Sequence, residues 1–129
     1  MSKNEAPIIE KYWERIGGTL ILEFPAVKKS SSNGPRRIDA IILPDEEKKR
    51  LHWMQASFQN KDIIVVQAKT GRLGMTVMGQ AFFSFELMKK FRPRSIKSVI
   101  LCQEDDSVLK PLLAPYPHIE VVVIPRENL

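Results

Sequence analysis

Apolar residues near the N-terminus recur at the spacing of one helical face. The stripe consists of Ile8, Ile9, Tyr12, Trp13 and Ile16. Proline suits the first turn of a helix and glycine commonly ends one, so we predict a helix that Ala6-Pro7 opens and Gly17 ends. A second helical pattern, apolar over most of its circumference, spans residues 75–91 and ends before Pro93.

Short runs rich in β-branched residues indicate strands between these helices and after the second one. The predicted strands are residues 19–24, 37–43, 62–69, 95–102 and 119–124. A polar loop with the sequence KKSSSNGP joins the first two strands, and a glycine-containing turn follows the third. Two further helices are expected, over residues 107–113 and within 45–61. The second expectation rests on the helical spacing of Leu51, Met54 and Phe58.

The order of these elements is α-β-β-β-α-β, followed by a further short helix and strand. Consecutive strands joined by polar loops favour an antiparallel meander, whereas a strand–helix–strand run favours a parallel crossover. We therefore predict an α/β fold with a mixed sheet. The 129 residues are expected to form one domain.

Composition narrows the classes of function and location. The chain carries 20 basic and 15 acidic residues, a net charge of +5, which permits binding to a polyanion without requiring it. No apolar run reaches the length of a membrane span, and the N-terminal residues lack the basic-then-apolar pattern of a signal peptide. The single cysteine, Cys102, allows neither an internal disulfide nor a cysteine-based zinc site. A cytoplasmic protein with no membrane partner is expected.

Three polar residues lie on predicted strands where their side chains can meet. Gln67 and Lys69 are two residues apart, so they point to the same face of one strand. Asp39 lies on the preceding strand, and its carboxylate approaches both of them if the two strands pair. Mg²⁺ accepts carboxylate and amide oxygens, and an ammonium group stabilises negative charge that develops on a phosphate. The constellation indicates a metal site suited to phosphoryl chemistry.

The pattern around these residues resembles the PD-(D/E)XK nuclease superfamily. The matching residues are Arg36-Arg37-Ile38-Asp39, Val66-Gln67-Ala68-Lys69, Thr70-Gly71, and Gln80 on the following helix. The lysine–threonine–glycine turn and the helix glutamine resemble RecB-type nuclease domains and archaeal Holliday-junction resolvases in particular. The resemblance extends over residues 8–124 and implies a restriction endonuclease-like core. It also implies Mg²⁺- or Mn²⁺-dependent hydrolysis of phosphodiester bonds in DNA, in which Asp39 and Gln67 hold the metal and Lys69 positions or deprotonates water.

Members of this superfamily often add a glutamate from the first helix to the metal site. Glu5, Glu10 and Glu14 are the candidates, and Glu5 precedes Pro7, so it is expected outside the helix. At about 100° per residue, Glu10 lies closer than Glu14 to the buried stripe, which makes Glu10 the predicted ligand. Gln67 stands where the superfamily usually has an acidic residue, and its neutral oxygen binds Mg²⁺ less tightly. The alternative is therefore a non-catalytic module that binds nucleic acid or a protein.

Basic and polar residues near the motif are candidates for contacts with DNA. They are Lys28, Lys29, Arg36, Arg37, Arg72 and Gln80. The first four bracket the loop that leads to Asp39, although each is equally compatible with ordinary solvated charge. Trp53 and Phe58 either stack on bases or belong to the core.

The long apolar helix predicts a partner chain. Its two stripes are Val77, Met78, Ala81, Phe82, Phe85 and Met88, and Phe83, Leu87 and Phe91. A helix that is apolar on two faces needs cover on both, so we expect a homodimer through this helix or the last strand. The chain has no separate specificity domain, which favours DNA cleavage that selects a structure or depends on a protein partner.

Overall fold

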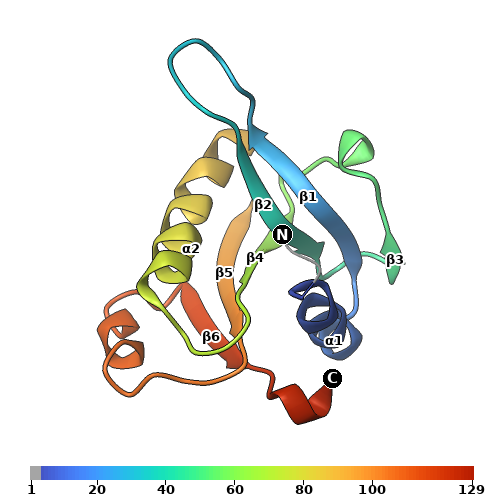
Figure 1. The fold of residues 1–129 in the computed structure, drawn as a ribbon. Coiled ribbons are helices and arrows are strands. Elements are labelled where there is room, and N and C mark those ends of the chain that lie inside the picture. The colour runs from blue at the N-terminus through green and yellow to red at the C-terminus, as the bar shows by residue number, and fades with distance from the viewer. Residues whose placement is uncertain (1–3) are drawn as a thin grey trace.

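The computed structural model describes residues 4–129, which contain two α-helices and six strands (Figure 1). In chain order these are α1 (Ala6–Ile16), β1 (Thr19–Val27), β2 (Arg36–Leu43), β3 (Lys49–Arg50), β4 (Asp62–Ala68), α2 (Met75–Met88), β5 (Ser95–Cys102) and β6 (Ile119–Val123). Short 3-10 helices occur at η1 (Trp53–Gln55), η2 (Lys89–Phe91), η3 (Lys110–Leu113) and η4 (Arg126–Asn128).

The strands form one mixed sheet in the order β3-β1-β2-β4-β5-β6. β1, β2 and β4 pair in antiparallel fashion, whereas β4, β5 and β6 are parallel. A polar hairpin loop joins β1 to β2, a longer segment that contains β3 and η1 joins β2 to β4, and α2 provides the crossover between β4 and β5. The α/β class and the mixed sheet predicted from the sequence are confirmed.

The two helices cover opposite faces of the sheet. Ala40 of β2 packs in one apolar cluster with Ile9 of α1, whereas its neighbour Ile41 packs in another with Met88 of α2. Successive side chains of a strand point to opposite faces, so this alternation separates the two layers. The predicted N-terminal stripe is buried as expected, except that Ile16 at its end is 40% exposed.

The helix predicted within residues 45–61 is wrong. Part of this segment is extended, because β3 pairs with the outer edge of β1 and the Leu51 amide donates to the Leu20 carbonyl at 2.9 Å. A single 3-10 turn follows, at Trp53–Gln55. Hydrogen bonds to the backbone groups at this edge of β1 thus favour an extended conformation more strongly than the weak helical spacing favours a helix. Phe58 belongs to the core, at 3% exposed, whereas Trp53 is only partly buried.

Two helix boundaries also differ from prediction. α2 ends at Met88, and the residues after it form a 3-10 turn rather than a continuation of the α-helix. Only Lys110–Leu113 is helical in the 107–113 segment, also as a 3-10 turn. Asp106 caps the amides of Val108 and Leu109, and Pro111 lacks the amide hydrogen that an α-helix needs there.

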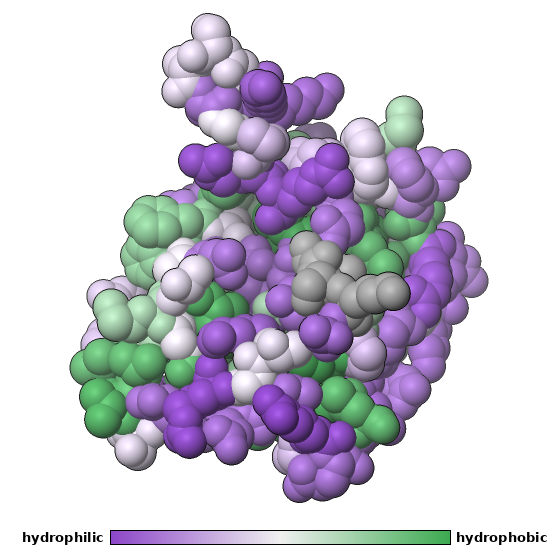
Figure 2. All heavy atoms as spheres, in the orientation of Figure 1, coloured by the Kyte–Doolittle hydropathy of each residue, from purple (hydrophilic) through white to green (hydrophobic). Residues whose placement is uncertain are grey.

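The second apolar stripe of α2 is covered largely by the same chain. Leu87 and Phe91 pack against the cluster that contains Met88, while Phe83 remains 64% exposed. Hydrophobic residues gather over α2 and η3 on the left of Figure 2. The homodimer stays a prediction, for which Phe83 offers one contact. In residues 4–129 no helix is long and apolar enough to cross a bilayer.

Gly79→Ala is expected to stabilise the protein. Gly79 lies inside α2, and a Cβ built on it meets no atom within 4 Å. Alanine reduces the conformational freedom of the unfolded chain, so the free energy of unfolding should rise by about 0.5–1 kcal/mol. Urea denaturation measures the change, and a lower midpoint would show that this position of the helix is more crowded than the geometry indicates.

Candidate functional site

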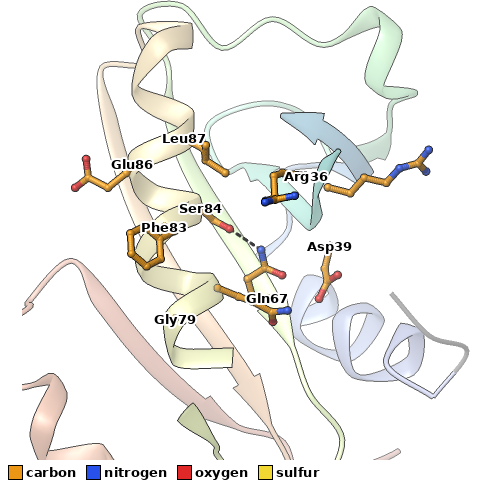
Figure 3. Close-up of a pocket in the computed structure, with 10 residues that line it drawn as sticks. Arg36, Asp39, Gln67, Gly79, Phe83, Ser84, Glu86 and Leu87 are labelled. Atoms are coloured by element: carbon orange, nitrogen blue, oxygen red, sulfur yellow. Dashed lines mark hydrogen bonds between the residues drawn. The ribbon is translucent and has the colours of Figure 1, made fainter. Parts of the chain in front are cut away.

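Asp39 and Gln67 lie opposite each other on neighbouring strands. The antiparallel register pairs Ala40 with Val66, and its continuation by one residue places Asp39 across from Gln67. Both side chains line a cavity of about 680 Å³ between the sheet and α2. Figure 3 shows the Asp39 carboxylate and the Gln67 amide pointing toward one another. This part of the predicted constellation is therefore brought together by the fold.

Gln67 is held in one orientation. It is 4% exposed, and its Nε2 donates to the Ser84 hydroxyl of α2 at 2.6 Å. The amide oxygen is thereby left on the side of Asp39 (Figure 3). Ser84 was not among the predicted site residues. It falls on the buried face of α2, four residues before Met88 and three after Ala81, where a small polar residue is a signal of an internal hydrogen bond.

The carboxylate of Asp39 is only partly accessible to solvent. Burial raises its pKa, and the amide of Ala68, which donates to Oδ2 at 2.9 Å, counteracts part of that effect. The negative charges of Glu5 and Glu23 raise the pKa further. The charges of these two glutamates thus disfavour ionisation of Asp39, and a cation near its carboxylate would offset that effect.

Asp39→Asn is expected to raise the thermal stability at neutral pH. The folded protein holds the Asp39 proton more tightly than the unfolded chain does, so this group destabilises folding as the pH rises from 3.8, the ordinary pKa, through the raised pKa. Asparagine removes the charge and keeps an oxygen acceptor for the Ala68 amide. Thermal unfolding at about pH 7 and about pH 3 should show a gain that shrinks in acid. A gain that is equal at both values would rule out the ionisation of Asp39 as its cause.

Lys69 lines a second cavity, of about 450 Å³, between the N-terminal ends of the two helices. Its walls include Glu5, Ala68 and the first turn of α2, and Gln80 lines both this cavity and that of Asp39. The lysine side chain passes close to the helix, since a Cβ at Gly74 would lie 3.2 Å from Lys69 Cε. Gln80 is exposed, so it is accessible from solvent at the boundary of the two cavities.

Of the acidic candidates near α1, the structure places Glu5 rather than Glu10 at the Lys69 cavity. Glu10 forms an ion pair with Arg50 of β3 and lines neither cavity. Glu5 occupies the N-cap position of α1, where its carbonyl accepts the amides of Ile8 and Ile9. Helical angles compare only residues inside the helix, so they gave no information on the position of Glu5, just before it.

Glu23 is a second acidic residue near Asp39 that was not predicted from the sequence. It lies in β1 opposite Asp39, between the pairs Leu22–Ala40 and Phe24–Ile38. Its φ of 53° is in the left-handed region, which glutamate rarely adopts. Leu22 packs on the α1 side of the sheet and Phe24 on the α2 side, so the chain changes face at this residue. The sequence did contain one indication: Glu23 is the only charged residue in the otherwise apolar strand β1.

The turn that carries Lys69 is fastened to the end of β5. The Lys69 amide donates to the Leu101 carbonyl at 2.9 Å, and the Gly71 amide donates to the side-chain oxygen of Gln103 at 2.8 Å. Gly71 has a φ of 79°, which glycine adopts without strain. Gln103 is 8% exposed and also accepts a hydrogen bond from Arg126. Gln103 holds the turn through contacts between segments distant in the sequence, and no local sequence pattern predicts such contacts.

The predicted DNA-binding residues fall into two groups. Arg36 and Arg37 line the Asp39 cavity, and Lys28 and Lys29 line an adjoining one with Arg37. Arg72 is instead engaged elsewhere, in an ion pair with Glu104 at 3.1 Å and a hydrogen bond to the Asp105 carbonyl. The structure therefore does not place Arg72 with the others.

The donor set at this site contains few strong metal ligands. Within residues 4–129, no three side chains of Asp, Glu, His or Cys gather closely enough to hold a metal ion. A cation here would depend on Asp39, on the neutral oxygen of Gln67, and on water. Comparison of the chain with protein-family models, with curated proteins and with solved structures gives no match.

Proposed function

We propose that this chain is a deoxyribonuclease with a restriction endonuclease-like core, which hydrolyses phosphodiester bonds in DNA with Mg²⁺ or Mn²⁺. The observation that carries the proposal is the position of Asp39 opposite Gln67, with Lys69 directly after the end of β4. The order of helix, antiparallel strands, crossover helix and parallel strand supports it as well.

Asp39 and Gln67 fit a hard divalent cation in both chemistry and orientation. The buried carboxylate carries a charge that a cation stabilises, and the hydrogen bond to Ser84 turns the Gln67 amide oxygen toward it. Mg²⁺ commonly uses one or two carboxylates and keeps several waters, so a set with few protein ligands suits it. When bound, the ion supplies positive charge that stabilises the transition state of phosphodiester hydrolysis.

The neighbouring cavity suits the phosphate group. Lys69 contributes a positive charge, and the first turn of α2 contributes a helix N-terminus that no side chain caps. Backbone amides and the helix dipole at such an end attract anions. Lys69 therefore neutralises charge that develops on the phosphate, or orients the attacking water, while Arg36 and Arg37 hold the DNA backbone at the mouth of the Asp39 cavity.

The proposal is tested by incubating the protein with plasmid, single-stranded and branched DNA in Mg²⁺, Mn²⁺ or EDTA. Cleavage of at least one DNA with metal and none with EDTA is expected. If the protein binds DNA but cleaves none of these substrates with either metal, the proposed nuclease activity is overturned and the alternative, a non-catalytic module, is favoured. The neutral Gln67 and the absence of a three-residue acidic metal group in residues 4–129 are the observations that favour that alternative.

Glu5→Gln and Glu10→Gln should separate the two acidic candidates of α1. Glu5 lines the Lys69 cavity and its charge reaches Asp39, whereas Glu10 pairs with Arg50. We expect Glu5→Gln to lower the cleavage rate by about 10- to 100-fold, as loss of a supporting group at a metal site does. Glu10→Gln should leave the rate unchanged. Titration of the rate against Mg²⁺ concentration measures both, and the reverse order of effects would restore Glu10 as the ligand.

A further inference from the structure

A third cavity, of about 660 Å³, lies between β1, the η1 segment and η2, the turn that follows α2. We call it the aromatic groove. Its walls include Phe24, Trp53, Phe58 and Phe91, and Lys28 and Lys90 are also among the residues that line it. Met54, beside Trp53, is 73% exposed. The groove therefore offers a flat aromatic side chain and apolar surface to a ligand that arrives from solvent.

The aromatic walls of the groove support one another. Phe24 lies 4.9 Å from Phe58 and 5.2 Å from Phe91 between ring centroids, both in edge-to-face geometry. Contacts of this kind fix the ring planes and favour a shape that exists before a ligand binds. Trp53 packs against the same cluster and remains partly accessible.

The charge along the groove is entirely positive. No acidic residue lines it, and it continues into a smaller cavity of about 250 Å³ that shares Lys28 and Trp53 with it and Arg37 with the Asp39 cavity. The three cavities thus follow one another around the base of the β1–β2 hairpin. In Figure 2 the loop of this hairpin and the surface below it are mainly hydrophilic.

The cations along this route make few contacts within the fold: Lys90 lies 5.2 Å from the centroid of the Phe91 ring, and Arg36 donates to the Pro35 carbonyl. Among residues 4–129, no salt bridge involves Lys28, Lys29, Arg36, Arg37 or Lys90. Elsewhere on the surface, Lys61, Arg94 and Lys97 each pair with a carboxylate. A row of unpaired cations next to an accessible aromatic side chain has the chemistry that binds single-stranded nucleic acid, where lysines follow the phosphates and aromatic rings stack on bases.

We propose that the aromatic groove binds an unpaired stretch of the DNA strand that passes the Asp39 site, with a base stacked on Trp53 and flanking phosphates near Lys28 and Lys90. The identity of the strand as the substrate rests on the proposed nuclease function. The binding itself requires neither the metal nor Asp39. A double helix keeps its bases stacked inside, so the groove selects single-stranded or unpaired segments.

Tryptophan fluorescence in EDTA tests this directly. The full chain is titrated with an oligothymidylate of about 12 nucleotides, with an abasic oligomer of equal length, and with a duplex. Trp13 is 9% exposed and donates to the Gly18 carbonyl, so a change caused by DNA is assigned to Trp53. We expect oligothymidylate to quench the emission and to bind at least about fivefold more tightly than the abasic oligomer, because stacking adds to the phosphate contacts.

Two variants isolate the groove. Trp53→Ala should abolish the quenching and the preference for bases, and its circular dichroism reports whether it is folded. Lys28→Glu with Lys90→Glu changes only exposed side chains and should weaken binding at least about tenfold at low salt. Lys97→Glu with Lys110→Glu makes the same change in net charge at two cations that already pair with Glu120 and Asp105, so it is the matched control and should bind with little change.

Each result decides between the two proposals. Equal affinity for the oligothymidylate and the abasic oligomer, or no quenching of Trp53, overturns the groove even if DNA is cleaved. Base-dependent binding without cleavage in Mg²⁺ or Mn²⁺ keeps the groove and removes the nuclease function. No binding to any DNA overturns the groove and leaves a protein or small apolar ligand as its occupant.

Discussion

Asp39→Asn is expected to lower the rate of metal-dependent DNA cleavage by about a thousandfold or more, while the protein stays folded. A metal ion contributes several kcal/mol of transition-state stabilisation, and each 1.4 kcal/mol corresponds to about a factor of ten in rate. Asp39 is the only charged side chain directly opposite Gln67 in the described sheet, so its charge is the least replaceable feature of the site. Single-turnover cleavage of the best substrate measures the loss.

The same variant separates activity from folding. Its thermal stability at neutral pH should exceed that of the natural chain, because the charge it removes is disfavoured by burial. Mg²⁺ should raise the unfolding temperature of the natural chain and leave that of Asp39→Asn unchanged, since ligand binding stabilises only the state that binds. Full cleavage by Asp39→Asn would exclude this carboxylate from the metal site.

Lys69→Met and Arg72→Met form a matched pair within one turn. Lys69 lines the cavity at the start of α2, whereas Arg72 is held by Glu104 and the Asp105 carbonyl. Only the first substitution is expected to reduce cleavage as Asp39→Asn does. Equal losses in both would indicate that the net charge of the turn matters rather than the position of Lys69.

Gly18→Ala is expected to lower the free energy of unfolding by about 3 kcal/mol, because it combines backbone strain with a clash. Gly18 has a φ of 80°, and a Cβ there would lie 2.5 Å from the Leu43 carbonyl oxygen and 2.9 Å from Pro44 Cα. Both contacts are with backbone, which cannot move aside as a flexible side chain can. The carbonyl of Gly18 also accepts the Trp13 indole at 2.8 Å, so a shift here disturbs the attachment of α1.

Urea denaturation of Gly18→Ala beside Gly79→Ala provides the comparison. The two substitutions add the same methyl group, one against backbone in the left-handed region and one into open space on a helix. Opposite signs are expected. A loss below about 1 kcal/mol for Gly18→Ala would mean that the backbone at Leu43 and Pro44 moves away from the added methyl group at little cost.

The sequence was informative where one pattern dominated locally. The strand Asp62–Ala68 is rich in β-branched residues and buried almost throughout, so its burial and its propensity agree. Residues 45–61 lacked such agreement. Their conformation depends on the outer edge of β1, where Leu51 finds a partner in Leu20, more than thirty positions earlier in the chain. Long-range pairing of this kind leaves little trace in local spacing.

The candidate site was predictable in part for the same reason. Asp39 and Gln67 were placed together because adjacent strands and alternate residues follow simple geometry. Glu5 and Glu23 were not, since one lies outside the helix that was used for comparison and the other adopts a rare backbone conformation. Ser84 and Gln103 act through side-chain hydrogen bonds to distant segments, which composition does not reveal.

The attachment of the Lys69 turn to β5 has a consequence for the growing polypeptide. Asp39, Gln67 and Lys69 leave the ribosome well before Leu101 and Gln103, which hold the turn through the amides of Lys69 and Gly71. The site is therefore incomplete until the C-terminal third of the chain has been made and has paired. Synthesis itself thus delays the assembly of the proposed DNA-cutting centre. A chain truncated before β5 would contain every motif residue without the hydrogen bonds that hold the Lys69 turn in place.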